Sequence, residues 1–383
     1  MQRHTQIGIA VAAIALAFVG MAQYVSTHTA TLPAQNSFVG SASNPVVGQI
    51  PNPGKMNEDD GDTLPILANA MPPFSGIASW LNSQPLTPEG LRGKVTLIDF
   101  WTYSCINCLR TLPYTTSWDQ KYRDKGFVLV GVHTPEFAFE KVESNVRNAI
   151  TQQHIAYPVA LDNDYGTWNA YNNRYWPAEY LFDAEGRLRY VHFGEGNYDV
   201  TEGNIQKLLA EAGVTVDMAK TSVSSTMNLD AVRSPETYIG YARSAGFASP
   251  ERVLKDGEQT YTAPKTLAEN ELALEGKWSV GEEEAETRGS AAISYRFTAS
   301  NVNLVMGRDN EAGATEAEVT MDGKAVPVDF RGKDITAHDG KTFVRITNHR
   351  LYSLIDAQGI YGTHTIRIQF PDAGVGAYAF TFG

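Results

Sequence analysis

The sequence is poor in cysteine: its 383 residues hold two, Cys105 and Cys108. Two cysteines exclude a scaffold held together by several disulfide bonds. No second pair of cysteines and no closely spaced pair of histidines accompanies them, so a zinc site would lack its remaining ligands. A structural disulfide between the two is an alternative, although so short a ring stabilises little. A further alternative is that the two cysteines lie close together in the sequence by chance.

The chain also lacks a cluster of Lys or Arg, and its formal net charge is −12. This acidity argues against binding to nucleic acid and against docking on anionic lipid. Hydrophobic residues make up 43% of the chain and charged residues 19%, which is typical of a globular protein. The length gives room for two domains, each with its own core.

Long hydrophobic runs are absent except at the N-terminus, where residues 7–22 are sixteen uncharged residues behind Arg3 and His4. A membrane span needs about 20 such residues, so residues 1–24 are interpreted as a signal peptide or a single membrane anchor. Residues 25–70 follow as a flexible linker rich in Pro, Ser and Asn. We therefore expect the folded part of the chain in the periplasm or elsewhere outside the cytoplasm, secreted or tethered to the inner membrane.

The cysteines directly follow an apolar run, Val95–Trp101, that predicts a buried strand. Ser104 is a good helix N-cap, which would make Cys105 the first helical residue and place Cys108 one turn later on the same face. A helix N-terminus favours the thiolate, so we expect a lowered pKa for Cys105, while Cys108 stays a thiol until needed. An exposed nucleophile beside a sheltered partner is the arrangement needed for thiol–disulfide exchange, which requires no cofactor.

Two patterns of elements divide the remainder of the chain. Residues 71–214 alternate strands with helices and then form a hairpin, which predicts a mixed sheet with helices on both faces. The helices are expected at residues 105–124, 139–154, 166–173 and 201–212. Residues 215–383 contain a loop-rich connector at 234–264 and then about eight short strands with regular turn signals, which predict an all-β, jelly-roll-type sandwich.

The residues around the cysteines resemble the thioredoxin-like superfamily, in its redoxin branch. The resemblance is carried by Asp99, Trp101 and Pro113 at their spacing from the cysteines, and by Trp176–Pro177 before a strand. It implies a redox-active disulfide Cys105–Cys108, with Asp99 relaying protons to Cys108. It also implies that Pro177 is cis and binds the substrate chain together with Trp101 and Trp176. The dipeptide Ile106–Asn107 differs from thioredoxin, and the reaction's direction and potential stay open.

Longer motifs resemble the extracytoplasmic portion of DipZ-type proteins over about residues 70–383. These motifs are WTYSCINCLRTLPY, GVHTPEF, YPVALDND, YWPAEYLFD, HFGEG and the C-terminal half from SPETYIGYAR to AYAFTFG. The resemblance implies an enzyme that reduces protein disulfides in the cell envelope, with cytochrome c maturation as one use. It further implies a CcdA-like membrane electron donor and a carbohydrate-binding-module-like C-terminal domain with a glycan ligand. The CcdA-like domain itself is expected to be lacking.

Two rival functions use the same residues. A thiol peroxidase is suggested by Thr102, three residues before Cys105 as in peroxiredoxins, but Ile98 stands where those proteins have proline. A copper-handling protein would use both thiolates and a histidine such as His133, but such folds usually separate the cysteines by three residues. Peroxide consumption and copper binding would distinguish these rivals from a thiol–disulfide oxidoreductase, which we expect.

Overall fold

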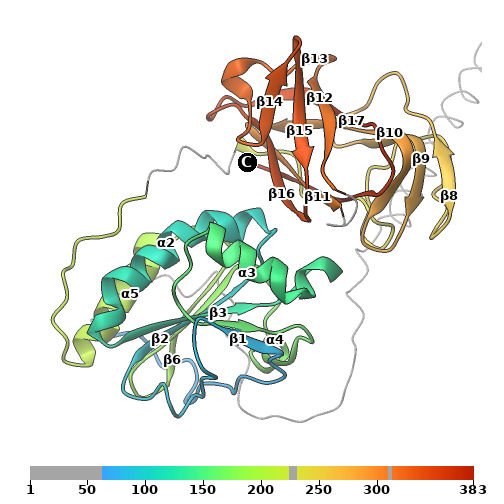
Figure 1. Ribbon diagram of the computed structural model, residues 1–383. Helices are drawn as coiled ribbons and strands as arrows, with labels where there is room; N and C mark the ends of the chain where they lie inside the picture. The colour runs from blue at the N-terminus through green and yellow to red at the C-terminus, as the bar shows by residue number, and fades with distance from the viewer. Residues whose placement is uncertain (1–62, 224–230, 309–312) are drawn as a thin grey trace, which may run out of the picture. The chain divides into compact units, whose positions relative to one another are not determined.

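The computed structural model describes residues 63–223, 231–308 and 313–383, and in these segments no helix has the length and apolarity needed to span a membrane. The predicted signal peptide or anchor and most of the predicted linker lie outside the described residues. The described chain forms an α/β domain between Ser79 and Glu211 and an all-β domain between Thr237 and Phe382, called here the β domain. This is the predicted fold class, a thioredoxin-like domain followed by a β-sandwich (Figure 1).

One six-stranded sheet organises the α/β domain, in the order β1-β4-β3-β2-β5-β6. Its strands are β1 (Ser79–Leu81), β2 (Val95–Trp101), β3 (Phe127–His133), β4 (Val159–Leu161), β5 (Ala178–Phe182) and β6 (Leu188–Phe193). Strand β2 pairs with β3 in parallel and with β5 in antiparallel fashion, so the sheet is mixed as predicted. All seven residues of β2 are buried, which explains its nearly continuous apolar sequence.

Helices cover the two faces of this sheet unequally (Figure 1). Side chains of α2 (Ile106–Tyr122), α3 (Glu143–Gln152) and α5 (Tyr198–Glu211) pack with Leu97 and Trp101 of β2. Ile98 and Phe100 point to the other face, where they pack with residues of α4 (Gly166–Ala170) and of the segment before β1. Because side chains alternate along a strand, Asp99 lies on the α2 face between Leu97 and Trp101.

The helix that carries the cysteines differs from the prediction by one residue. It begins at Ile106, and Cys105 is its N-cap residue, with extended backbone angles of φ −74° and ψ 118°. Ser104, predicted as the cap, instead directs its hydroxyl to the buried carboxylate of Glu140. The helix ends through a 3₁₀ turn, Arg123–Lys125, at Gly126, whose φ of 79° is the left-handed conformation typical of a C-terminal glycine.

The helix predicted at residues 139–154 is broken into two elements. A 3₁₀ turn, Ala138–Lys141, is followed by α3, and Val142 between them is extended, with φ −77° and ψ 110°. The break allows Glu140 to point inward, where it is fully buried, whereas Glu143 begins α3 on the surface. The sequence did not predict this break, because the spacing of apolar residues indicates which of them are buried and gives no information about a buried carboxylate.

Twelve strands form the β domain as one continuous hydrogen-bonded sheet. They are β7 (Thr237–Tyr238), β8 (Glu258–Tyr261), β9 (Leu272–Val280), β10 (Ala285–Ala299), β11 (Asn301–Arg308), β12 (Thr315–Met321), β13 (Lys324–Ala325), β14 (Ile335–His338), β15 (Lys341–Ile346), β16 (Arg350–Asp356), β17 (Gly362–Phe370) and β18 (Val375–Phe382). A 3₁₀ turn, Val328–Phe330, follows β13. Strand β10 pairs with different strands along its length, since residues 285–286 pair with β18 and residues 291–299 pair with β17.

Strands β7, β8 and β9 were not predicted. The first two lie within residues 234–264, which were expected to form a loop-rich connector. In β9 the alternation is interrupted at Gly276, which faces the irregular step of β10 between Thr287 and Ala291. Gly276 has a φ of 86°, and a Cβ there would lie 2.7 Å from the backbone oxygen of Ser290. The bulge therefore requires glycine. This glycine interrupts the strand-like pattern of residues 272–280, so the sequence does not indicate a strand there.

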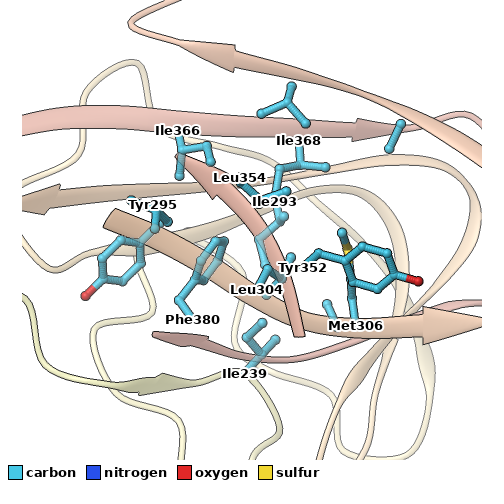
Figure 2. Close-up of a cluster of buried hydrophobic side chains, with 14 of the residues drawn as sticks. Ile239, Ile293, Tyr295, Leu304, Met306, Tyr352, Leu354, Ile366, Ile368 and Phe380 are labelled. Atoms are coloured by element: carbon cyan, nitrogen blue, oxygen red, sulfur yellow. The ribbon is translucent and has the colours of Figure 1, made fainter. Parts of the chain in front are cut away.

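The core of the β domain is apolar and is contributed by both layers. Figure 2 shows Ile293 of β10 with Ile366 and Ile368 of β17, together with side chains from β11, β16 and β18. Tyr352 is fully buried, and its hydroxyl donates to the backbone oxygen of Asn348 at 2.8 Å. A buried hydroxyl with a partner avoids the free-energy penalty of an unpaired polar group.

Candidate active site

The two cysteines have different environments. Cys105 is partly exposed and Cys108 is 1% exposed, and both are free thiols. The backbone N–H of Cys108 donates to Sγ of Cys105 at 3.3 Å. The sulfur of Cys105 therefore occupies the place of an N-cap acceptor, where a negative charge is stabilised by the helix N-terminus. The geometry makes Cys105 the accessible sulfur and leaves Cys108 sheltered behind it.

The pKa of the Cys108 thiol is raised well above its ordinary value. Burial is the largest cause, followed by the hydrogen bond with Cys105 and the negative charges of Cys105 and Asp99. A thiol with a raised pKa remains protonated at neutral pH, and only its thiolate attacks a disulfide. Cys108 therefore needs a base that removes its proton when it reacts.

Asp99 is the buried carboxylate below Cys108. It is 1% exposed, and its Oδ1 has no hydrogen-bond partner among the described residues. Burial raises the pKa of Asp99 to about 7. A carboxylate with a pKa near neutrality exists in both protonation states at working pH, which suits a general base. Its charge also raises the pKa of Cys108, so the two groups are electrostatically linked.

Glu140 holds the loop that leads into the cysteine helix. Its Oε1 accepts from the hydroxyl of Ser104 at 2.6 Å and from the Ser104 backbone N–H at 3.3 Å. Its Oε2 accepts from the backbone N–H groups of Glu136, at 2.5 Å, and Phe137, at 3.0 Å. Burial is the main cause that raises the pKa of Glu140 to about 7. This one side chain fixes the residue immediately before Cys105.

Aromatic and polar groups support the same loop from the end of β3. Tyr103 stacks on His133 with ring centroids 5.7 Å apart, and Trp101 meets His133 edge-on at 5.2 Å. Nε2 of His133 lies 3.3 Å from the hydroxyl of Thr102. Burial lowers the pKa of His133 to about 3, so its ring is neutral at physiological pH. Thr102 and His133, considered for a peroxidase and a copper protein, thus contact each other.

The residues expected to bind substrate lie close together in the sheet but differ in exposure. The Trp176–Pro177 peptide bond is cis, as predicted. Ala178 pairs with Phe100, so Pro177 continues β5 beside Trp101 at the end of β2 where the cysteine loop begins. Trp176 is partly exposed, and its Nε1 donates to the backbone oxygen of Thr134 at 3.1 Å. Trp101, in contrast, is fully buried, so it supports the loop from below and offers no surface to a substrate.

Two carboxylates at this site were not singled out from the sequence. Glu140 comes from the break before α3, and Glu179 of β5 lies opposite Asp99 of β2. Neither belongs to a recognisable motif. Pairing of β2 with β5 would have placed Glu179 beside Asp99, but that register follows only from the folded sheet. A third carboxylate, Glu195, forms an ion pair with Arg110 of α2, with Oε1 and Nη1 3.1 Å apart.

Comparisons with known proteins agree with this geometry. Residues 67–209 match the family model described as Redoxin, and residues 234–383 match the one described as Thioredoxin like C-terminal domain. Thiol-disulfide oxidoreductase YkuV of Bacillus subtilis (strain 168) is 30% identical over 145 residues, which cover 38% of this chain and 97% of YkuV. The chain belongs to the thioredoxin-like thiol–disulfide oxidoreductases.

The similarity also extends into the β domain. Protein DipZ of Mycobacterium tuberculosis (strain CDC 1551 / Oshkosh) is 38% identical over 333 residues, which cover 85% of this chain and 45% of DipZ. The chain is therefore a homologue of DipZ that spans about half the length of that relative. A solution structure of a thioredoxin-like protein in the oxidized form is 31% identical and covers 39% of this chain and 97% of its own, with a TM-score of 0.35.

Proposed function

We propose that this thiol–disulfide oxidoreductase works outside the cytoplasm as a reductant of protein disulfides. The observation that carries the proposal is the asymmetry of the two thiols: Cys105 is accessible at the helix N-cap, and Cys108 is buried beside Asp99. Such a pair opens a substrate disulfide in two steps. An electron donor of the CcdA-like membrane class would then restore the dithiol, and cytochrome c maturation is one process that would use it.

The first step is attack on the substrate by Cys105. Its thiolate bonds to one sulfur of the substrate disulfide, and the other substrate sulfur leaves as a thiolate that takes up a proton. In the second step Asp99 accepts the Cys108 proton, and the Cys108 thiolate attacks Sγ of Cys105. The second substrate sulfur leaves, so the substrate gains two electrons and two protons while Cys105 and Cys108 form a disulfide. Trp176 and Pro177 border the approach to Cys105.

Trapping of the intermediate tests this assignment. In Cys108→Ser the mixed disulfide on Cys105 has no partner thiol to release it, so envelope proteins should accumulate on the chain in a non-reducing gel. Cys105→Ser should trap far less, because the Cys108 sulfur is buried. The double serine variant is the matched control. Equal trapping by both single variants, or none by Cys108→Ser, would contradict the mechanism.

A peroxidase would give a different result, because its cysteine is oxidised by peroxide to sulfenic acid without a protein disulfide. Peroxide consumption by the reduced wild-type chain, compared with Cys105→Ser, separates the two activities. For the location, a membrane-impermeant maleimide added to intact cells should label Cys105. Labelling only after lysis would refute the extracytoplasmic assignment.

The β domain offers a groove for a second, independent proposal, a glycan ligand. The groove has a volume of about 470 Å³ and is lined by residues 263–267, by β9, β10, β12 and β17, and by the turn after β12. Its polar side chains include Glu275, Arg296, Asp322 and Arg367. Arg367 and Glu275 form an ion pair, with Nη2 and Oε2 3.0 Å apart. Paired donors and acceptors of this kind suit sugar hydroxyls. Shifts of groove resonances on titration with envelope polysaccharide, lost in Arg296→Ala, would support it, and unchanged spectra would refute it.

A further inference from the structure

Three ionisable side chains form a row across the α/β sheet. Asp99 of β2 is directly opposite Glu179 of β5, and Glu179 is directly opposite His192 of β6. Residues opposite one another on neighbouring strands point to the same face, with Cβ atoms about 4.5–5.5 Å apart. The neighbours Leu97 and Leu181 place this row on the face covered by α2 and α5. The row starts below Cys108 and ends on β6, the last strand of the sheet.

Burial changes along the row. Asp99 and Glu179 are each 1% exposed, whereas His192 is partly exposed. Among the described residues, Oδ1 of Asp99 and Nε2 of His192 are buried polar atoms without a hydrogen-bond partner. Glu179 keeps one bond, in which the hydroxyl of Thr201 donates to its Oε2 at 2.9 Å. An unpaired buried polar atom costs about 1–3 kcal/mol, so a native fold that retains two of them at the ends of one row calls for an explanation.

The mechanism itself supplies a need for this row. Asp99 takes a proton from Cys108 in each turnover, yet it is sealed from water. A buried base that cannot pass its proton on works once and then stays protonated. Strand β3, on the other side of Asp99, presents Gly131 at the paired position, where no side chain can carry a proton. His133, further along β3, pairs with Trp101 and contacts the hydroxyl of Thr102. The ionisable side chains next to Asp99 on its own sheet therefore lie in one direction, towards β6.

We propose that Glu179 and His192 form a proton relay that carries the Cys108 proton from Asp99 to solvent. Both residues act through Asp99 and touch neither the substrate nor the reacting sulfurs. The inference rests on the function proposed above. The Cys108 proton passes to the Asp99 carboxylate, leaving the thiolate that attacks Cys105. Glu179, which is protonated near neutral pH, gives its own proton to the neutral ring of His192, which releases it to water. Asp99 then passes the Cys108 proton to the Glu179 carboxylate and regains its charge, so each group returns to its starting state.

The acidities of Asp99 and Glu179 suit transfer in both directions. Burial raises the pKa of Asp99 to about 7, and burial followed by the charge of Asp99 raises that of Glu179 to about 8. A proton moves between two groups of similar pKa with little change in free energy. Burial lowers the pKa of His192, so its ring is neutral at pH 7, and transfer from Glu179 to this ring is the uphill step of the row. The other titratable groups facing the row are Cys105 at the N-cap of α2, Cys108 of α2, Tyr157, Tyr190 of β6, Tyr198 of α5 and the Arg110–Glu195 pair.

The test separates the two chemical steps with Ellman's reagent. The reduced full-length chain releases one coloured thiolate when Cys105 attacks and a second when Cys108 resolves the mixed disulfide. In Glu179→Gln and His192→Asn the first release should keep its wild-type rate. The second should slow about tenfold at pH 7, because an amide cannot pass the proton on. Glu202→Gln is the matched control, since Glu202 is also 1% exposed but lies outside the row.

A purely structural role is excluded by chemical rescue. Imidazole at millimolar concentration should restore the second release in His192→Ala, because a small base can replace a partly exposed histidine, and it should leave the buried Glu179→Gln unchanged. In wild type the second rate should rise with pH between 6 and 8, and in Glu179→Gln this rise should flatten. Wild-type second-release rates in both row variants, or equal slowing in Glu202→Gln, would overturn the relay. Loss of the first release in Cys108→Ser would instead count against the proposed function.

Discussion

The α/β domain buries nine side chains of Asp, Glu, His and Arg, whereas the described residues of the β domain bury none of these four types. The nine are Asp99, Asp119, His133, Glu140, Asp162, Glu179, Asp183, Arg189 and Glu202. The buried polar residues of the β domain are Ser, Thr and Asn. Burying a charge costs free energy unless it is paired, and the β domain demonstrates that a large fold forms without it. The buried ionisable groups of the α/β domain therefore need reasons beyond stability.

Partners divide these groups into two kinds. Asp183 accepts from Arg189 at 3.0 Å and from the Arg187 backbone at 2.9 Å, and these bonds outweigh burial and lower its pKa. In the described part of the chain no cation contributes to the pKa of Asp99 or Glu179, and both pKa values are raised. The paired carboxylate fixes a turn, and the unpaired ones are poised to exchange protons. The carboxylates without a cation, Asp99 and Glu179, are the ones near the cysteines.

The largest expected difference between the domains is the response of stability to pH. The raised pKa values of Asp99, Glu140 and Glu179 mean that the folded state favours protonated acids, so this stability is present at low pH and is lost progressively as pH rises from about 4, where the unfolded acids ionise, to 7–8. Between pH 6 and 8.5 we expect the α/β domain to lose about 2–4 kcal/mol. His133 opposes this only below about pH 6.5, where the unfolded chain gains its proton.

Amide hydrogen exchange of the full chain, resolved by peptide and corrected for intrinsic rates, measures this difference. Peptides of β2 and β3 should lose protection between the two pH values, while those of β10 and β17 keep theirs. Equal losses in both domains would show that the buried acids do not set the pH response.

The next largest effect is expected from Asp99→Asn. The second thiolate release with Ellman's reagent should slow about 100-fold at pH 7.5, equivalent to about 2.7 kcal/mol, because Cys108 loses its base. The first release should be unaffected. Asp119→Asn, which changes another buried aspartate on α2, is the control and should keep both rates. A wild-type second rate in Asp99→Asn would remove Asp99 from the mechanism.

The smallest effect is expected from a substitution in the apolar core of the β domain. Ile293→Val removes one methylene from a fully buried side chain and should destabilise the β domain by about 1 kcal/mol. Both release rates should equal those of wild type, because this core contains no group that the reaction uses. Denaturant unfolding followed with the release assay checks both parts. A slowed reaction in this conservative variant would show that the β domain contributes to catalysis.

Local sequence was sufficient for much of the fold and for the centre of the site. Strand β2 was predicted at its observed bounds, because its apolar, β-branched run reflects burial directly. The cysteine spacing, the cis Trp176–Pro177 bond and the buried Asp99 were also read from the sequence and its family resemblance. Weakly patterned segments such as β7, β8 and β9 were missed, because their residues are set by a bulge and by neighbouring strands.

The sequence by itself determined that Cys105 and Cys108 share the start of one helix beside a carboxylate, because these residues are close along the chain. Only the tertiary structure decided which other groups join them. Glu140 lies 36 residues from Ser104, whose hydroxyl it binds. Glu179 meets Asp99 only through the antiparallel register of β2 and β5. A shift of that register by one residue would turn Glu179 to the opposite face, and no local pattern of the sequence records which register the sheet adopts.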